Sequence, residues 1–422
     1  MTLKSRQNRT GNRHVTVLGA GVIGMATAVH LLRDGHDVTV VDRQDPGQGC
    51  SFGNAGILAA SYCAPMAMPG AVFQVPKWLL DPLGPLSIRW RDFPSLIPWF
   101  FKFIQAGSSA KAEASSNALR SLHKDTVRDF HDLFSSIGAG HLVKSSGYMY
   151  AYESARELAK HQVEWDMVKS QGVRLEMIDG NTLHEMEPAL APGFVAGVLL
   201  PDDGQVTNPL AIVEALAEHF VAGGGTILKA RARDMEIGPE GPTKLRTDAG
   251  DLELDALVIA AGAFSGEFAA RLGSKVPLVG ERGYHITLTE PGVTTRRPVM
   301  SGEGKFAMTP MSMGLRLAGT AEFASLDAPP NYDRAKVLLK HASRVLPGIN
   351  TDVHTEWMGH RPSLPDSLPV IGPSPHFPSV FFAFGHSHAG LMGSVVTGRA
   401  IADLVATRDT SLNISPFRID RF

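Results

Sequence analysis

Cysteine and net charge are scarce in this sequence. It has 2 cysteines in 422 residues, too few for a disulfide framework, a zinc site built from cysteine alone or its own iron–sulfur cluster. The 40 Lys and Arg residues are balanced by 42 Asp and Glu residues, so no positive excess exists to neutralise a phosphate backbone, which argues against nucleic-acid binding. No apolar run reaches the ~18 residues needed to cross a bilayer.

The start of the chain also lacks an apolar segment. Residues 1–12 carry Lys4, Arg6 and Arg9 with no hydrophobic run behind them, and we expect a mobile tail. A transit peptide is the alternative for such a basic stretch. Because no secretory signal is present and cysteines are few, we expect a cytoplasmic protein. At ~150 residues per domain, the length indicates two or three domains.

The strongest positive signal is a strand–turn–helix–strand pattern. The β-branched run His14–Leu18 predicts a strand, and the turn Gly19-Ala20-Gly21-Val22-Ile23-Gly24 follows it. Val22–Arg33 then predicts a helix with one apolar face, and residues 38–41 a second strand. Asp42 ends that strand 18 positions after Gly24, near the spacing of about 20 typical of the acid that binds a ribose hydroxyl.

Each part of this pattern has a physical reason. Gly19 allows the tight turn, Gly21 lets a pyrophosphate approach the backbone, and Gly24 lets the helix pack against the strand. The helix N-terminus offers free N–H groups and a partial positive charge to the phosphates. The pattern therefore predicts dinucleotide binding, with a glycine-rich structural turn as the alternative. Asp42 favours a free 2′-hydroxyl and argues against NADP, but it does not choose between NAD and FAD.

The next stretch, residues 48–58, is small, polar and glycine-rich. It can offer backbone N–H groups to a ligand lying along it, or it is a plain loop. Together, the glycine turn, Asp42-Arg43 and Ser51-Phe52-Gly53-Asn54-Ala55-Gly56 resemble the D-amino-acid oxidase and dehydrogenase superfamily of FAD enzymes. The likeness is greatest to bacterial D-amino-acid and D-hydroxyproline dehydrogenases. Residues 201–209, 255–265 and 357–393 resemble the same superfamily, so the likeness runs from about residue 14 to 405.

The resemblance implies an α/β (α+β) fold of two interwoven domains. A Rossmann-type FAD-binding domain is expected over residues 13–70, 205–275 and 355–410. A substrate-binding domain on a mostly antiparallel sheet is expected over 71–204 and 276–354. Within these, we predict strands at 226–228, 277–288, 306–309, 314–319 and 380–383, and helices at 210–221, 333–346 and 392–405. A helix is also predicted over 111–137, interrupted at Ser115 and Ser116.

The resemblance also implies non-covalent FAD, because no cysteine precedes Arg361 where sarcosine oxidases attach their flavin. The residues expected to contact FAD come from the three nucleotide-domain segments. They are Gly19, Gly21, Gly24, Asp42, Arg43, Ser51, Asn54, Ala55, Gly56, Ala232, Ala261, Gly262, Gly385, His386, Gly390, Leu391 and Met392.

Oxidation of an amine by flavin needs the substrate Cα–H aimed at the flavin N5, and a carboxylate anchor fixes that orientation. Arg suits this role because its planar fork gives two parallel hydrogen bonds. By resemblance, Arg361 is the anchor; the alternative is a structural pair with Asp366 or Glu356. His388 is expected near the substrate, unless it is a loop histidine without a role. Tyr284 is either a substrate-facing hydroxyl or a core tyrosine.

Histidine and cysteine are the remaining residue types that could serve a metal or redox role. His386 and His388 are spaced i,i+2, but no third ligand stands at a sensible spacing, so we expect no metal. Cys50 and Cys63 are predicted to be buried small residues rather than redox partners.

The expected function is FAD-dependent oxidation of the Cα–N bond of a D-amino or cyclic imino acid to the imine, by hydride transfer to flavin N5. The resemblance favours D-proline or cis-4-hydroxy-D-proline. The run Phe306-Ala307-Met308-Thr309-Pro310 lacks the tyrosine of glycine-oxidase-like relatives, which favours a substrate bulkier than glycine. Electrons are expected to pass to a quinone or other carrier. The alternatives are an oxidase that uses oxygen, an FAD-binding subunit active only in a hetero-oligomer, and an NAD-dependent dehydrogenase; the oligomeric state stays open.

Residues 72–104 interleave aromatic and basic side chains, among them Trp78, Trp90, Trp99 and Lys102. Such a stretch can lie in a membrane interface, which would make the protein peripheral to the inner face of the membrane. The alternative, which we favour, is that the aromatics pack at a domain interface or shield the site.

Overall fold

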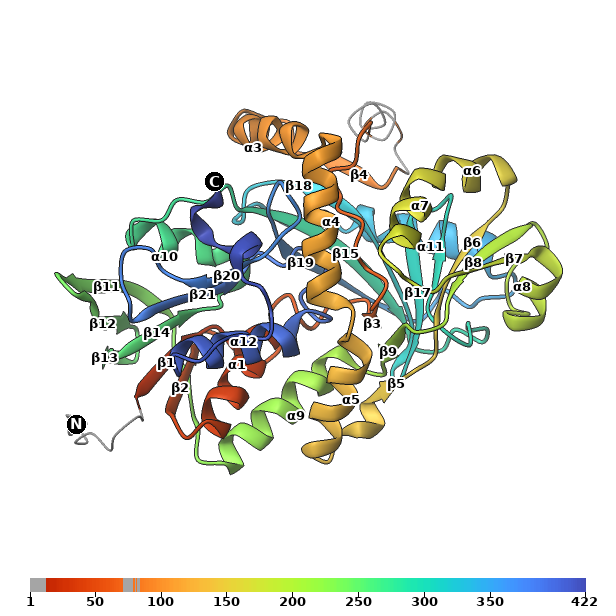
Figure 1. Cartoon of the computed structure of the whole chain (residues 1–422). Coiled ribbons are helices and arrows are strands. Elements are labelled where there is room, and N and C mark those ends of the chain that lie inside the picture. Colours follow the sequence, from red (N-terminus) through yellow and green to blue (C-terminus); the bar gives the residue numbers. More distant parts are fainter. Residues whose placement is uncertain (1–12, 71–78, 80, 82–83) are drawn as a thin grey trace.

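The computed structural model of the chain describes residues 13–70, 79, 81 and 84–422, so the expected tail 1–12 and Trp78 lie outside the described residues. The fold has two halves, each built on its own sheet (Figure 1). Helix α4 (Ser109–His123) runs between them in this view. The α/β fold class predicted from the sequence is confirmed.

The first half is a six-stranded sheet in the order β10-β2-β1-β14-β21-β20. Pairing is parallel from β10 to β21, and β20 runs antiparallel to β21. Its strands are β10 (Thr226–Lys229), β2 (Asp37–Asp42), β1 (His14–Leu18), β14 (Ala256–Ile259), β21 (Val380–Phe384) and β20 (Val370–Pro373). The central strands are apolar on both sides because both faces are covered, as parallel sheets require.

Helices cover one face of this sheet and a second small sheet covers the other. Helices α1 (Val22–Arg33), α9 (Pro209–Ala222) and α12 (Ser394–Val405) share one apolar core with β1. The opposite core joins α10 (Ser265–Arg271) to the antiparallel sheet of β11 (Ala232–Gly238), β12 (Gly241–Thr247) and β13 (Gly250–Glu253). The predicted bounds of β1 and α1 are confirmed, whereas α12 begins two residues later than predicted because residues 390–393 form turns.

The second half is a nine-stranded, mostly antiparallel sheet. Its main path is β19 (His354–Ser363), β15 (Val279–Leu288), β18 (Gly314–Phe323), β17 (Phe306–Met311), β16 (Val299–Ser301), β6 (Tyr148–Tyr152), β8 (Ala196–Leu200) and β7 (Glu176–Asp179), with β4 (Leu86–Ile88) beside β18. Helix α11 (Asp333–Val345) packs its apolar side on β15 and β18. Shorter helices lie towards the β7 end: α6 (Ala155–Lys160), α7 (Gln162–Ser170) and α8 (Gly180–Met186).

The predicted helix over 111–137 is two helices, α4 and α5 (Thr126–Ser136), and the predicted interruption is in the wrong place. Ser115 and Ser116 lie inside α4 and are buried, so they are small packing residues rather than helix breakers. The break comes at Lys124 and Asp125, where the chain turns so that the Thr126 hydroxyl donates to the carbonyl oxygen of Met392.

Two strands show how tightly the halves are interwoven. β19 lies in the segment 355–410 that was expected in the nucleotide domain, yet it pairs along its full length with β15 of the second sheet. β9 (Gly204–Val206), at the start of the segment 205–275, pairs instead with β3 (Ile57–Leu58) and β5 (Val143–Lys144) in a small separate sheet. Motif boundaries in the sequence do not reveal such pairing because it is made between distant segments.

The aromatic stretch is partly buried and partly exposed. In α3 (Phe93–Ala106), Trp99 is buried and stacks on Phe103 and against Phe323, as packing residues do. On the same helix, Phe101 and Ile104 are exposed, together with Trp90 just before it. Within the described part of the chain, no helix has both the length and the apolar character to cross a membrane.

Candidate active site

Two adjoining cavities lie where the two halves meet. The first has a volume of about 470 Å³ and the second about 390 Å³. The residues that line both are Cys50, Asn54, Trp357, Gly359 and Ser387. The two cavities therefore lie side by side, and these five residues face both of them.

The first cavity collects most of the residues predicted to bind the nucleotide. Those that line it are Gly19, Gly21, Asp42, Arg43, Ser51, Asn54, Ala232, Ala261, Gly262, Gly385, His386, Gly390 and Leu391. Ala55 and Met392 line the second cavity instead. Gly24 and Gly56 line neither and support the backbone around the site: a Cβ at Gly24 would lie 1.8 Å from the carbonyl oxygen of Gly19.

Gly21, unlike Gly24, has free space where a side chain would be. A Cβ at Gly21 would have only the Ser51 hydroxyl within 4 Å, at 3.3 Å, so packing of the chain does not demand glycine there. Its φ of −71° is also open to any residue. The space belongs to the cavity, at the N-terminus of α1, where N–H groups and the helix dipole favour an anion. This arrangement fits a pyrophosphate.

The acid and the loop after β2 are held in place by the backbone of the turn. Asp42 accepts hydrogen bonds from the N–H groups of Ala20 at 2.7 Å and Gln44 at 2.9 Å. The Ser51 hydroxyl accepts from the N–H of Val22, the first residue of α1, at 2.9 Å. The carboxylate and the loop are thereby fixed at the rim of the first cavity, as recognition of a ribose and a phosphate requires.

The C-terminal wall of the first cavity is equally ordered. The buried His386 ring lies 3.0 Å from the Thr397 hydroxyl of α12, and burial, with His123 adding to it, lowers the pKa of His386 to about 3. His386 is therefore a neutral ring at pH 7. The Arg43 guanidinium, which also lines this cavity, lies 4.3 Å from the centroid of the Phe264 ring.

Sequence reasoning missed the residues that hold the loop between the cavities. Arg316 of β18 is buried and donates to the carbonyl oxygens of Phe52 at 2.9 Å and Asn54 at 2.8 Å. His285 stacks on Trp357, with ring centroids 5.0 Å apart, and its Nδ1 lies 3.2 Å from the carbonyl oxygen of Gly53. No local pattern marks Arg316 and His285, because the loop carbonyls that they contact lie more than 200 positions away.

Arg361 of β19 lines the second cavity, and its guanidinium packs against Gly283 of the neighbouring strand β15. Its Nη1 donates to Glu281 at 2.7 Å and to the carbonyl oxygen of Thr320 at 3.1 Å. Among the described residues, Nε and Nη2 have no hydrogen-bond acceptor, so one edge of the fork is open to a ligand.

The partners suggested from the sequence for Arg361 are wrong. Asp366 pairs with Arg421, and Glu356 lies near His354. Glu281 could not be identified as the partner because the ion pair depends on the register of β15 against β19.

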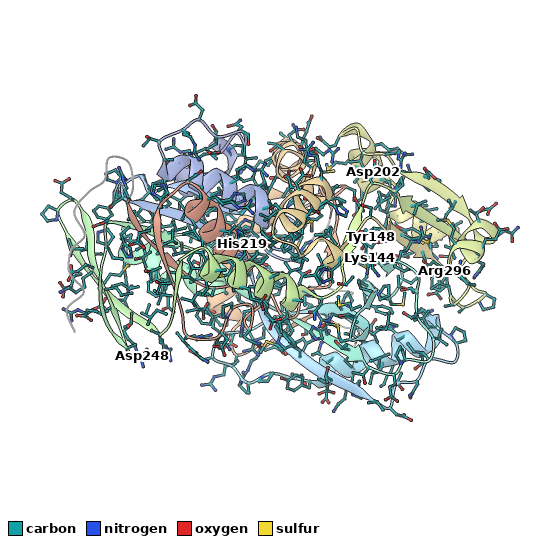
Figure 2. All side chains as sticks on the ribbon, turned by 90° about the horizontal axis from the view of Figure 1, so that it is seen from below. Lys144, Tyr148, Asp202, His219, Asp248 and Arg296 are labelled. Carbon is teal, nitrogen blue, oxygen red and sulfur yellow. The ribbon has the colours of Figure 1, made fainter. Side chains whose placement is uncertain are left out.

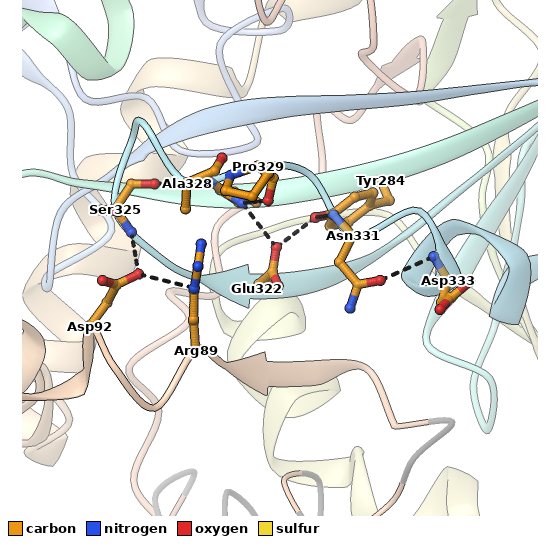
Figure 3. A network of polar contacts seen from close by, with 10 residues as sticks. Arg89, Asp92, Tyr284, Glu322, Ser325, Ala328, Pro329, Asn331 and Asp333 are labelled. Carbon is orange, nitrogen blue, oxygen red and sulfur yellow. Dashed lines mark hydrogen bonds and ion pairs between the residues drawn. The ribbon is translucent and has the colours of Figure 1, made fainter.

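Tyr284 and His388, the other two predicted catalytic residues, differ in whether their polar atoms are free to bind a substrate. Tyr284 lines the second cavity, but its hydroxyl donates to Glu322 at 2.5 Å and accepts from the N–H of Asn331 at 3.0 Å (Figure 3). With an exposed fraction of 1%, it fits the core interpretation.

His388 opens into the second cavity and its ring meets Tyr62 edge-on, with centroids 5.0 Å apart. The ring is exposed to the cavity, but the protein around it desolvates the imidazole and, with the Arg361 charge, lowers the pKa of His388 to about 4. The imidazole is therefore neutral at pH 7. It can donate or accept a hydrogen bond in the cavity.

Comparison with known proteins decides the family. Residues 14–404 match the model of the DAO family, described as FAD dependent oxidoreductase. This chain belongs to the DAO family. A D-amino-acid oxidase of Bradyrhizobium diazoefficiens is 37% identical over 417 residues, which cover 97% of this chain and 99% of that protein. A D-amino acid dehydrogenase of the same organism is 31% identical, with 97% and 98% covered.

Solved structures share the DAO fold. A glycine oxidase from Geobacillus kaustophilus superposes with a TM-score of 0.76 at 22% identity, over 98% of this chain and 100% of that one. An L-proline dehydrogenase from P. horikoshii superposes with a TM-score of 0.75 at 19% identity, over 97% and 98%. The protein is thus an FAD-dependent oxidoreductase, and the NAD-dependent alternative is set aside.

One cysteine departs from the sequence prediction. Cys63 is buried as expected, but Cys50 is exposed and lines both cavities of this DAO-family protein. Cys50 was predicted to be buried, but it lies in a loop beside a cavity. A loop residue belongs to no repeating apolar pattern, so the sequence around it does not indicate whether it is buried. The exposed surface of Cys50 faces the cavities, where the surrounding protein desolvates the thiol and raises its pKa to about 11, so it is a thiol rather than a thiolate at pH 7.

A buried carboxyl behind the second cavity predicts a pH effect on stability. Asp203 accepts from the N–H of Ser61 at 2.9 Å and from its hydroxyl at 2.6 Å, and burial raises its pKa to about 7. Because the unfolded value is about 3.9, the folded state binds the proton more tightly, and stability is lost as the pH rises from about 4 to about 7.

We expect Asp203→Asn to remove this dependence of stability on pH. For three pKa units, the total change in the free energy of unfolding is at most about 4 kcal/mol. Thermal unfolding midpoints of both proteins between pH 4.5 and 8 measure the effect. Parallel curves for the two proteins would contradict it.

Proposed function

We propose that this protein oxidises the Cα–N bond of a D-amino or cyclic imino acid to the imine. The observation that supports this most is the open edge of the Arg361 fork in a cavity that shares a wall with the flavin-binding cavity. That geometry suits a carboxylate beside a reacting Cα. The names of the two Bradyrhizobium relatives agree with an amino-acid substrate.

In this proposal, Nε and Nη2 of Arg361 bind the substrate carboxylate, while Glu281 holds the guanidinium from the other side. The neutral ring of His388 offers a hydrogen bond to the substrate amine or carboxylate. Transfer into the cavity removes water and favours the uncharged amine, whose lone pair assists the reaction. Bound non-covalently, FAD supplies the two-electron acceptor for the hydride that leaves Cα. Water then hydrolyses an acyclic imine, and a cyclic one persists.

The proposal also covers which amino acid is oxidised and which acceptor takes the electrons. The resemblance favours D-proline and cis-4-hydroxy-D-proline, yet a cavity of about 390 Å³ is larger than a pyrrolidine ring needs and falls in the range of drug-sized sites. Electrons pass from the reduced protein to a quinone or another carrier. Peroxide release in air, measured against anaerobic dye reduction, distinguishes this from an oxidase.

The test is a visible spectrum of the purified holoprotein before and after anaerobic addition of single amino acids. We expect D-amino acids to bleach the flavin band near about 450 nm and L-amino acids to leave it unchanged. Bleaching by the single chain also excludes a subunit that works only in a hetero-oligomer. A flavin band that no amino acid bleaches would contradict the proposed function.

A further inference from the structure

The second cavity continues well beyond the reach of Arg361. Its far wall is formed by Glu164 and Trp165 of α7, Tyr148 and Tyr150 of β6, and Lys305. Figure 2 marks Tyr148 in the half of the molecule opposite to Asp248, which lies between β12 and β13 of the nucleotide-binding half. Arg361 lies on β19 and the two tyrosines on β6, with four strands between them in the sheet order. A substrate held by its carboxylate at Arg361 can therefore extend its side chain along the cavity towards this far wall.

Glu164 is the group on the far wall that lacks a partner. Its carboxylate lines the cavity, and no described residue donates a hydrogen bond to it or forms an ion pair with it within 4 Å. The residue is half-buried, and desolvation raises the pKa of its carboxyl. An ionised carboxylate in such a place is costly unless a donor or a cation meets it.

Lys305, the nearest cation, is already engaged. Its Nζ contacts Nε2 of His161, and burial together with Lys305 lowers the pKa of that histidine to about 4, so the ring is neutral and accepts. The charge of Lys305 is also shared among three carboxylates, those of Glu157, Glu164 and Glu303. Of these three carboxylates only Glu164 lines the cavity, because Glu157 is paired with Lys160 and Glu303 accepts from the N–H groups of Glu153 and Ser154. With Lys305 held by His161, the Glu164 carboxylate is the group that a cation can meet at this wall.

Between the two ends, the cavity suits an aliphatic stem. Val168, Leu200 and Met300 also line it, and the Tyr62 ring packs against His388. Methylene groups can bury their area along such a wall while a charged head reaches a polar group at its end.

We propose that the far end of the substrate cavity recognises a cationic side chain, with Glu164 as its counter-ion, so that the preferred substrates are basic amino acids such as D-lysine and D-arginine. This inference rests on the proposed function, because it assigns the α-carboxylate to Arg361. An ammonium or guanidinium at the end of a three- or four-carbon stem supplies the donors that the Glu164 carboxylate lacks.

The experiment compares kcat/KM of the holoprotein, with an artificial electron acceptor, for D-lysine, D-arginine, D-norleucine, D-glutamate and D-proline. We expect the two basic substrates to exceed D-norleucine by at least about 10-fold, since a hydrogen bond to a charged group is worth that much or more. Glu164→Gln keeps the shape of the side chain and should lower kcat/KM for D-lysine by about 10- to 100-fold, while D-norleucine stays within about 3-fold.

Asp166→Asn is the matched control, because Asp166 is exposed on the same helix and accepts from Gln162. It should leave all five substrates unchanged. Flavin content and thermal midpoint show that both variants are folded. Equal use of D-norleucine or preferred use of D-proline by the native protein, or an unchanged ratio of D-lysine to D-norleucine in Glu164→Gln, would overturn the inference alone. Failure of every amino acid to reduce the flavin would overturn the proposed function with it.

Discussion

Replacing Arg361 with alanine should lower kcat/KM for the amino-acid substrate by about 30-fold to several thousand-fold, mainly through a higher KM. Loss of one partner of a buried, hydrogen-bonded charge pair costs about 2–5 kcal/mol, and each 1.4 kcal/mol is a factor of about ten. Flavin content should not change, because Arg361 lines the second cavity and not the first. Steady-state kinetics at low substrate concentration measure the loss, and native activity there would refute the anchor.

The alanine variant also leaves Glu281 without its partner, so its carboxylate would repel the substrate carboxylate. The double variant Arg361→Ala with Glu281→Gln separates the two effects: recovery to native kcat/KM would mean that Arg361 only neutralises Glu281. Arg361→Lys keeps the charge but not the fork and should recover only part of the activity. Arg408→Ala is the matched control, because Arg408 forms exposed ion pairs with Asp34 and Asp403 away from both cavities.

Replacing Gly21 with valine should abolish FAD binding without unfolding the protein. The new side chain would enter the cavity where a pyrophosphate lies, since only the Ser51 hydroxyl is near it and the backbone angles of Gly21 suit any residue. We expect at least about 100-fold weaker FAD binding, which corresponds to roughly 3 kcal/mol.

Titration of the apoprotein with FAD, followed by flavin fluorescence, measures this affinity, and the thermal midpoint of the apoprotein should stay near the native value. Gly193→Val is the control, because a Cβ at that exposed glycine meets nothing within 4 Å. By contrast, Gly24→Val should destabilise the fold itself, since its Cβ would collide with the backbone of Gly19. Full flavin content in the Gly21 variant would show that the first cavity does not hold the pyrophosphate there.

The sequence predicted the nucleotide half in detail because that half is built from local patterns. Residues His14–Leu18 and Val22–Arg33 form the predicted strand and helix, and Asp42 ends the second strand at the rim of the cavity. Each of these elements is predicted by a pattern that spans only a few residues: an apolar run, a glycine turn or a helix stop. The DAO family and its FAD follow from the same short motifs.

The substrate side was decided by tertiary structure. The pairing of Arg361 with Glu281 depends on strand register, the hydroxyl of Tyr284 is committed to Glu322, and Arg316 reaches the loop at Phe52 from another sheet. Glu164 becomes notable only because α7 brings its carboxylate to the cavity, where no described residue donates a hydrogen bond to it. The motif residues are expected to bind the nucleotide through the conformation of their backbone, and the local sequence determines that conformation. The substrate cavity depends instead on which distant side chains share one buried space, and only the folded chain determines that.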